Sequence, residues 1–281
     1  MNKLTFITSV LLIALAGTSC GQRKYKSPAG YDLNNPIKYN MPPELLEISG
    51  IAFNNGNAGT IYAEQDEEGK LFYFRPGDKL PKYTKFGKRG DYEDVAILNN
   101  YAVLLRSDGS FYTFPISDIK ARDAAHVKEF KKLLPAGEYE GLHAAGGKLY
   151  ALCKICKGVD HNKQCKGYIL NLSTDGELSQ SSDFVIDVKK IAAITGSKKL
   201  KFHPSALAKN PLNGLWYILS SVNKLLVVTD GNWNVQQAYP INPNLFLQPE
   251  GLAFDSQGNL YISNEGNKAT PGNVLLFEYK R

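Results

Sequence analysis

SGIAF at residues 49–53 is the first of five copies of one short pattern. The other four copies are EDVAI at 93–97, EGLHA at 140–144, SALAK at 205–209 and EGLAF at 250–254. Each begins with Glu or Ser, continues with a short residue and then becomes apolar, and the starts lie 44, 47, 65 and 45 residues apart. Repeats of about 40 to 50 residues are typical of four-stranded propeller blades. The sequence therefore predicts an all-β protein, a β-propeller with five blades.

Further strand-like runs follow the copies of the pattern. In the last repeat these runs are Asn259 to Ser263 and Val274 to Tyr279, and the chain then ends at Arg281. Short β-branched and aromatic runs between Gly and Asn turns are strand and hairpin signals. A similar run at Asn35 to Asn40 precedes the first repeat. We therefore expect this N-terminal strand to complete the last blade, which closes the ring and removes exposed sheet edges.

The longest interval allows a second interpretation. It contains an insertion, Cys153 to Lys166, that accounts for its extra length. The alternative is a propeller of six blades, in which Ser182 to Leu200 forms a degenerate blade of its own.

The N-terminus predicts export. Lys3 precedes an uncharged run from Leu4 to Ala16, and small residues then lead to Cys20. This order is typical of a secretion signal, and the run is too short to span a bilayer comfortably as a helix. It resembles the lipobox of bacterial lipoproteins, which implies lipidation of Cys20, although Gly17 stands where that motif prefers leucine. An ordinary signal peptide cut elsewhere and an uncleaved anchor are the alternatives.

These features divide the chain into three parts. We expect residues 1–19 to be a lipoprotein signal peptide, 20–30 a lipidated tether and 31–281 a single propeller domain. The expected location is the cell envelope, on the outer membrane or a periplasmic face, with the lipidated N-terminus as the contact with the membrane. The net charge of +6 comes from scattered lysines, so no nucleic-acid partner is expected.

The first position of the pattern carries the predicted site. The innermost strand of each blade runs along the central channel, so this position is presented to one axis. Three of the five copies place a glutamate there, and carboxylates gathered in a small space repel one another unless protons or a cation compensate them. Calcium accepts six to eight oxygen ligands. The predicted calcium ligands are Glu93, Glu140, Glu250, Ser205, Glu47, Asp66 and Glu265, with further oxygens from Asp94 and Asp108.

Two residues of this rim are catalytic candidates. His203 lies two residues before Ser205, where its ring could act as a base or hydrogen-bond a ligand. Glu140 is the carboxylate that could share this task. The Ser205 pattern lacks the Gly-x-Ser-x-Gly surround of a hydrolase elbow, so that serine is interpreted as a channel oxygen.

The insertion holds a second constellation of Cys153, Cys156, His161 and Cys165. Its spacing comes near that of a zinc knuckle, which would use three thiolates and an imidazole. Outside the cytoplasm disulfide formation competes with metal binding. One disulfide within the loop and a spare thiol are therefore favoured, and zinc is the alternative.

The repeated phrases, together with Asp66-Glu67, Ser107-Asp108 and Asn264-Glu265 at the ends of second strands, resemble the SdiA-regulated family of bacterial propellers. The likeness extends from Glu44 to Arg281. It implies a propeller with a bound calcium ion and implies no defined reaction.

The expected function is that of an exported, lipid-anchored propeller that binds calcium at its channel and recognises a small molecule, a glycan or a protein there. One alternative is a calcium-dependent hydrolase of a lactone or phosphoester, in which the metal polarises the substrate. Another is a structural platform for a complex of envelope proteins.

Overall fold

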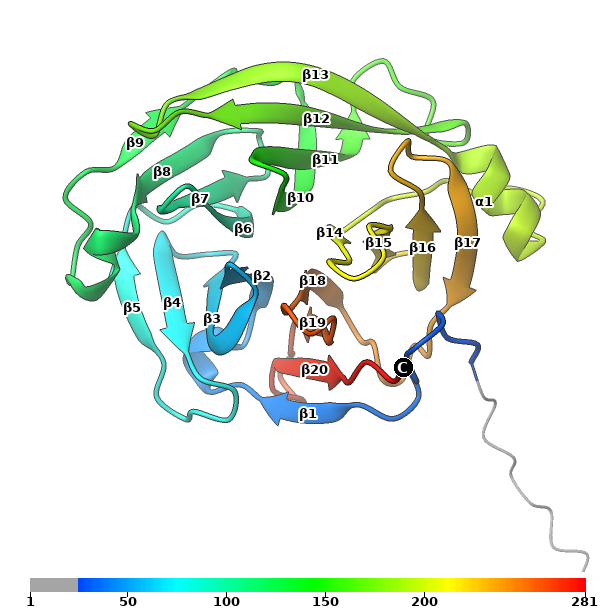
Figure 1. Ribbon diagram of the computed structural model, residues 1–281, viewed down its shortest axis with the longest axis horizontal. Helices are drawn as coiled ribbons and strands as arrows, with labels where there is room; N and C mark the ends of the chain where they lie inside the picture. Colours follow the sequence, from blue (N-terminus) through cyan, green and yellow to red (C-terminus); the bar gives the residue numbers. More distant parts are fainter. Residues whose placement is uncertain (1–24) are drawn as a thin grey trace, which may run out of the picture.

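The computed structural model describes residues 25–281, which form five sheets of four antiparallel strands arranged in a ring (Figure 1). The predicted signal peptide and Cys20 lie outside the described residues. Within residues 25–281, no helix is both long and apolar enough to cross a membrane.

Each sheet is one blade of a propeller, and the prediction of five blades is confirmed. Blade 1 comprises β2 (Ile48–Asn54), β3 (Asn57–Gln65), β4 (Lys70–Phe74) and β5 (Lys82–Lys85). Blade 2 comprises β6 (Tyr92–Leu98), β7 (Tyr101–Arg106), β8 (Phe111–Pro115) and β9 (Lys128–Phe130). Blade 3 comprises β10 (Gly137–Ala145), β11 (Lys148–Cys156), β12 (Gln164–Leu172) and β13 (Leu178–Asp187). Blade 4 comprises β14 (Ala206–Lys209), β15 (Trp216–Ser220), β16 (Leu225–Thr229) and β17 (Val235–Pro240). Blade 5 comprises β18 (Pro249–Phe254), β19 (Leu260–Asn264), β20 (Asn273–Phe277) and β1 (Ile37–Asn40).

The ring closes through the N-terminal strand, as predicted. Strand β1 is the outermost strand of blade 5 and pairs antiparallel with β20, so that Ile37 lies opposite Leu276. The last blade is therefore built from both ends of the chain. This closure supplies the fourth strand that the last repeat lacks.

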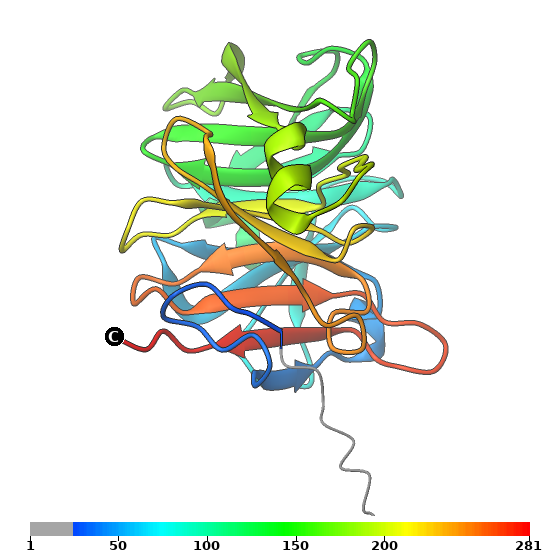
Figure 2. The same ribbon diagram turned by 90° about the vertical axis from the view of Figure 1, so that its right-hand side faces the viewer.

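The alternative of a sixth blade is wrong. The segment from Ser182 to Leu200 completes β13 and then forms α1 (Val188–Thr195), which lies on the outside of the ring (Figure 2). Asp187 caps the helix by accepting hydrogen bonds from two backbone N–H groups, and Gly196 ends it in the left-handed conformation. The insertion lengthens the β11–β12 hairpin, and the segment that contains α1, between β13 and β14, adds further residues to the long repeat interval.

The core is divided into five apolar clusters, each between two adjacent blades. Successive side chains of a strand point to opposite faces of its sheet. In β15, Trp216 and Ile218 therefore join the cluster shared with blade 3, whereas Tyr217 and Leu219 join the cluster shared with blade 5. Each blade is thus held on both faces, which fixes the positions of the innermost strands.

Two short 3-10 helices complete the secondary structure of residues 25–281. They are η1 (Pro43–Leu45), which precedes β2, and η2 (Ile116–Lys120), which follows β8.

Tyr31 ties the segment before β1 to the ring. Its hydroxyl donates to the Gly258 carbonyl (2.6 Å) and accepts from the fully buried Asn210 amide (2.8 Å). Tyr31→Phe leaves both groups without this partner, and an unsatisfied buried group costs about 1–3 kcal/mol. We expect the free energy of unfolding in urea to fall by about 2 kcal/mol. Tyr83→Phe is the control, since Tyr83 is 43% exposed; equal losses in the two variants would contradict the assignment.

Candidate functional site

The innermost strands β2, β6, β10, β14 and β18 surround the channel (Figure 1), and the five copies of the sequence pattern lie on them. A register shift interrupts the pairing with the second strand on either side of Glu93, Glu140 and Glu250. Such a β-bulge re-aims a side chain and increases the local twist. Each of the three predicted glutamates is therefore the bulged residue in the first half of its strand.

The bulges gather acidic side chains at the end of the channel where the innermost strands begin, which we call the acidic mouth. Burial is the main cause of the raised pKa of Glu93 and of Glu250, and the charge of Glu140 is the next cause for both, which shows that the three carboxyls are close together. The described residues that form the acidic mouth are Glu47, Glu64, Asp66, Asp91, Glu93, Glu140, Glu250 and Glu265.

Burial and mutual repulsion raise the pKa of several of these carboxyls. Burial, followed by the charge of Glu140, raises the pKa of Glu250 to about 7. Burial, followed by Glu250, raises that of Glu265 to about 8, and burial with Glu47 raises that of Asp66 to about 6. The acidic mouth therefore holds more negative charge than its surroundings compensate near neutral pH.

Three carboxylate oxygens of the acidic mouth are buried without a hydrogen-bond partner in the described chain. They are Glu64 Oε2, Asp66 Oδ1 and Glu250 Oε2. Glu64 is fully buried, and its other oxygen accepts from the Gly50 N–H (2.6 Å). Buried carboxylates normally have partners, so these oxygens indicate a place where a cation or bound protons complete the structure.

Sequence reasoning missed Glu64. It lies near the end of β3, two residues before Asp66, and directly follows an apolar part of the strand. A charged residue directly after buried apolar residues could have indicated a functional role.

Lys154 is the second missed residue, and it neutralises part of the acidic mouth. Its Nζ lies 2.5 Å from Glu140 Oε1, and Glu140 is only 8% exposed. The charge of the same ammonium group opposes the rise in pKa that burial and the charge of Glu140 cause in Glu93 and Glu250. Lys154 comes from β11, outside the repeated pattern, so the pattern could not reveal it.

The residues of the acidic mouth fit calcium in chemistry but are not preassembled around one point. Their donors are the hard oxygens that calcium prefers, and three of them are buried without a partner. Within residues 25–281, however, no three His, Cys, Asp or Glu side chains are placed to hold a metal ion together. Lys154 supplies positive charge to the side of the acidic mouth formed by Glu93 and Glu140. On the side formed by blades 1 and 5, Glu250 is also near the ammonium groups of Lys154 and Lys224, whereas burial and other carboxylates raise the pKa of Asp66 and Glu265.

The hydroxyl of Ser205, a predicted calcium ligand, is hydrogen-bonded to backbone groups. Its hydroxyl donates to the Pro249 carbonyl (2.8 Å) and accepts from the Ser221 N–H (3.2 Å). Ser49 likewise donates to the Glu93 carbonyl (2.9 Å). Both hydrogen bonds connect one blade to the innermost strand of the next blade. We call a side chain that makes such a bond a clasp between blades.

Asp94 is also a clasp between blades. It is buried, and its two oxygens accept from the Val95 N–H (2.8 Å) and from the Leu142 N–H of blade 3 (2.6 Å). Both oxygens are therefore committed to the backbone.

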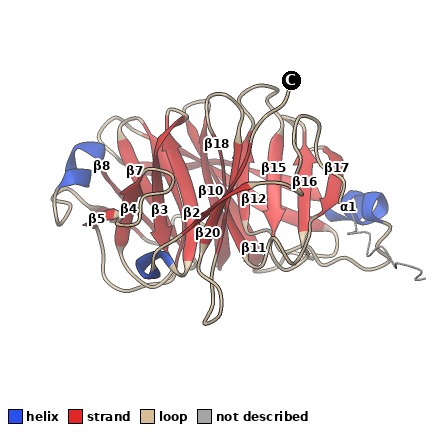
Figure 3. Ribbon diagram, turned by 90° about the horizontal axis from the view of Figure 1, so that it is seen from below, coloured by secondary structure: helices blue, strands red, loops and turns tan. Residues whose placement is uncertain are grey.

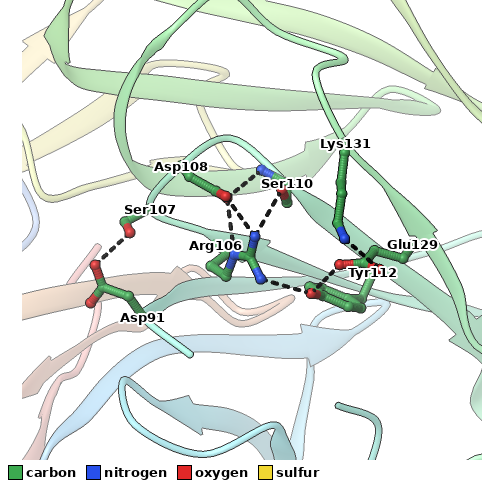
Figure 4. Close-up of polar contacts among 8 residues, drawn as sticks. All are labelled: Asp91, Arg106, Ser107, Asp108, Ser110, Tyr112, Glu129 and Lys131. Carbon is green, nitrogen blue, oxygen red and sulfur yellow. Dashed lines mark hydrogen bonds and ion pairs between the residues drawn. The ribbon is translucent and has the colours of Figure 1, made fainter. Parts of the chain in front are cut away.

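Asp108 is committed to Arg106 rather than to a shared ion (Figure 4). The guanidinium donates from Nε to Oδ1 (3.0 Å) and from Nη2 to Oδ2 (2.5 Å), and this pairing lowers the pKa of Asp108 to about 2. Arg106 also donates to the Tyr112 hydroxyl (3.0 Å), which in turn donates to Glu129. Asp108 and Ser107 line the wall of the acidic mouth beside Asp91, whose carboxylate accepts from the Ser107 hydroxyl.

The two rings of His161 and His203 lie stacked, with centroids 5.8 Å apart. Nδ1 of each ring is buried without a partner in the described chain, and His161 Nε2 accepts from the Cys156 N–H (3.0 Å). Burial, followed by the charge of Lys201, lowers the pKa of His203. Because Lys154 is also close to His203, this imidazole lies at the edge of the acidic mouth.

The cysteines of the insertion do not converge on a metal. The structure has a disulfide between Cys153 and Cys156, in the cluster shared by blades 2 and 3. Cys165 is a free thiol buried in the cluster on the other face of the sheet, and burial raises its pKa to about 12. The sheet thus separates the sulfur of Cys165 from the disulfide.

Comparison with known proteins defines the class. No family model and no curated protein matches the sequence. Glutaminyl cyclase from Myxococcus xanthus is similar in structure, with a TM-score of 0.58, 14% identity and coverage of 88% of this chain and 97% of that chain. A luciferin-regenerating enzyme has a TM-score of 0.52 at 11% identity, covering 87% and 95%. The calcium-binding protein regucalcin from Agrobacterium tumefaciens has a TM-score of 0.50 at 14% identity, covering 89% and 93%.

At these identities the likeness concerns the fold alone. The chain is a five-bladed β-propeller whose structural neighbours include a calcium-binding protein and enzymes.

Proposed function

We propose that the protein is an exported β-propeller, anchored by lipid on Cys20, that binds calcium at the acidic mouth and recognises a ligand there. The observation that carries the metal is the set of buried, unpartnered oxygens on Glu64, Asp66 and Glu250. A hard divalent cation supplies what these oxygens lack, and carboxylates are ligands that calcium prefers.

The distribution of charge indicates which side of the acidic mouth would hold calcium. Lys154 already neutralises Glu140 and reduces the cost of ionising Glu93. Of the carboxylates of blades 1 and 5, Glu250 is near the ammonium groups of Lys154 and Lys224. After burial, the neighbours that raise the pKa of Glu64, Asp66 and Glu265 are all carboxylates. The residues that would hold calcium are therefore Glu47, Glu64, Asp66, Glu250 and Glu265. This set keeps four of the predicted ligands and adds Glu64.

The ligand would enter beside this set. A polar cavity of about 570 Å³ lies between blades 2 and 3, lined by Asp91, Glu138, Glu140 and Lys154 among others. Carboxylates and an ammonium group around such a space offer both acceptors and donors, which suits a polyhydroxylated molecule such as a glycan. Calcium would fix the neighbouring wall when bound.

Calcium titration by calorimetry tests the proposal. Glu250→Gln keeps the shape of the side chain and removes its charge, so we expect calcium affinity to fall at least about tenfold, or about 1.4 kcal/mol. The matched control is Glu129→Gln, because Glu129 pairs with Tyr112 and Lys131 away from the unneutralised carboxylates. Circular dichroism checks that both variants fold. Equal affinities in the two variants, or no binding by the parent protein, would reject the site.

Calcium-dependent hydrolysis of a lactone or phosphoester is the second candidate. The observation that favours it is His203, whose lowered pKa keeps its ring neutral and whose Nδ1 is without a partner in the described chain. A neutral imidazole can accept a proton from a water molecule that reaches it. Turnover of a lactone or phosphoester that disappears in His203→Gln would support this reaction.

A further inference from the structure

The other end of the channel has a different character. A cavity of about 420 Å³ lies where the innermost strands end, and its apolar wall includes Ile51, Val95, Ile97 and Ala253. We call this cavity the apolar mouth. It lies on the face of the ring that carries the C-terminus (Figure 3), since β20 runs in the same direction as β18. Its volume is within the range of small-molecule sites, about 300–1,000 Å³.

Lys209 brings an uncompensated positive charge to the apolar mouth. It is the last residue of β14, lines the cavity and makes no ion pair within residues 25–281. Its Nζ lies 5.7 Å from the centroid of the Trp216 ring, a cation–π contact that restrains the side chain.

The one acidic residue that lines the same cavity, Asp255, is committed elsewhere. Its Oδ1 accepts from the Gln257 and Asn259 N–H groups (2.9 Å each), and its Oδ2 accepts from the Asn259 side chain (2.8 Å). These bonds stabilise the turn after β18. They leave the ammonium group of Lys209 available to an anion from outside.

His143 supplies a second polar group beside this lysine. Its ring lines the cavity, makes no hydrogen bond within the described residues and stands edge-on to Trp216, with centroids 5.7 Å apart. Burial, followed by the charge of Lys209, lowers its pKa to about 4. At neutral pH the ring is uncharged, so one nitrogen can donate a hydrogen bond and the other can accept one.

We propose that the apolar mouth binds a small organic anion with an apolar body, whose carboxylate contacts Lys209 and His143 and whose chain packs on Ile51, Val95, Ile97 and Ala253. A charge-assisted hydrogen bond to the ammonium group is stronger than one between neutral groups. Burial of the chain contributes about 25 cal/mol per Å² of apolar surface. A neutral molecule of the same shape loses the first contribution, and a cation is repelled by Lys209.

Three probes of equal length separate these contributions: octanoate, octanol and octylammonium, titrated by calorimetry at pH 7.5 in the presence of a chelator. We expect octanoate to bind at least about tenfold more tightly than octanol and octylammonium to bind least. Lys209→Met keeps the apolar stem, so the preference for octanoate should disappear while octanol still binds. Lys148→Met is the matched control, because Lys148 lies on the adjacent β10–β11 hairpin and does not line the cavity.

The outcomes that overturn the proposal are distinct. Equal binding of octanoate and octanol means that the cavity recognises apolar surface alone, and an unchanged preference in Lys209→Met means that another group holds the anion. Binding of none of the probes rejects the site. The chelator keeps the result independent of calcium binding at the acidic mouth.

Discussion

Calcium-free protein should melt at a lower temperature at pH 8.5 than at pH 5.5, and saturating calcium should raise the melting temperature at pH 8.5 by about 5–10 °C. The reason is the excess of negative charge around Glu250, Glu265 and Asp66. A ligand present at 100 times its Kd stabilises by about 2.7 kcal/mol, and 1 kcal/mol shifts the melting temperature by about 2–4 °C in a domain of this size.

The sign follows from proton binding. The pKa values of these three carboxyls in the folded protein are about 7, 8 and 6, above their ordinary values of 4.5 and 3.8. The folded state therefore holds protons that the unfolded chain has released, and stability falls as pH rises from about 4 to 8. Protons compete with calcium for the same oxygens, so the gain from calcium should be small at pH 5.5.

Differential scanning calorimetry of chelator-treated protein at both pH values checks this expectation. Glu250→Gln with Glu265→Gln should flatten the pH dependence, whereas Glu129→Gln should preserve it. Identical melting curves with chelator and with calcium at pH 8.5, at several protein concentrations, would rule out a structural calcium site.

Asp94→Ala should lower the free energy of unfolding by about 4 kcal/mol, more than Tyr31→Phe. The variant leaves the Val95 and Leu142 N–H groups buried without their acceptor, and each such group costs about 1–3 kcal/mol. The loss also removes a link between blades 2 and 3. Urea unfolding measures the effect.

Asp183→Ala is the matched control, because Asp183 forms an exposed ion pair with Lys166 (2.7 Å). Surface ion pairs contribute about 0–1 kcal/mol, so its loss should be small. Comparable losses in the two variants would show that Asp94 is not a clasp. Asp94→Asn should lie between them, since its amide retains one acceptor oxygen.

The blade number and the closure of the ring could be predicted because they depend on spacing. The pattern that includes Glu93 and Glu250 returns at the period of a blade, and the missing fourth strand of the last repeat required a partner from the N-terminus. The sixth blade was wrong because Ser182 to Leu200 has strand and helix signals but belongs to the outer edge of blade 3.

The site was less predictable because partners come from neighbouring blades. The pattern located Glu140 but not Lys154, which reaches it from the second strand. Ser205 shares the sequence position of the glutamates, yet its short side chain reaches the Pro249 carbonyl of the next blade. Bulges and the angle between blades decide which side chain reaches an adjacent strand. Neither feature can be read from a sequence repeat.

The hydrogen bond from the Lys280 N–H to the Gly30 carbonyl (2.8 Å) brings the two ends of the propeller to one point. Gly30 lies ten positions after Cys20, and this stretch of chain can span at most about 35 Å. If Cys20 is anchored by lipid, the rim of blade 5 would therefore stay close to the membrane. A tag added after Arg281 would then lie close to the bilayer. The same proximity makes the protein a good subject for circular permutation, with a short linker joining the present termini and new ones opened between blades 3 and 4.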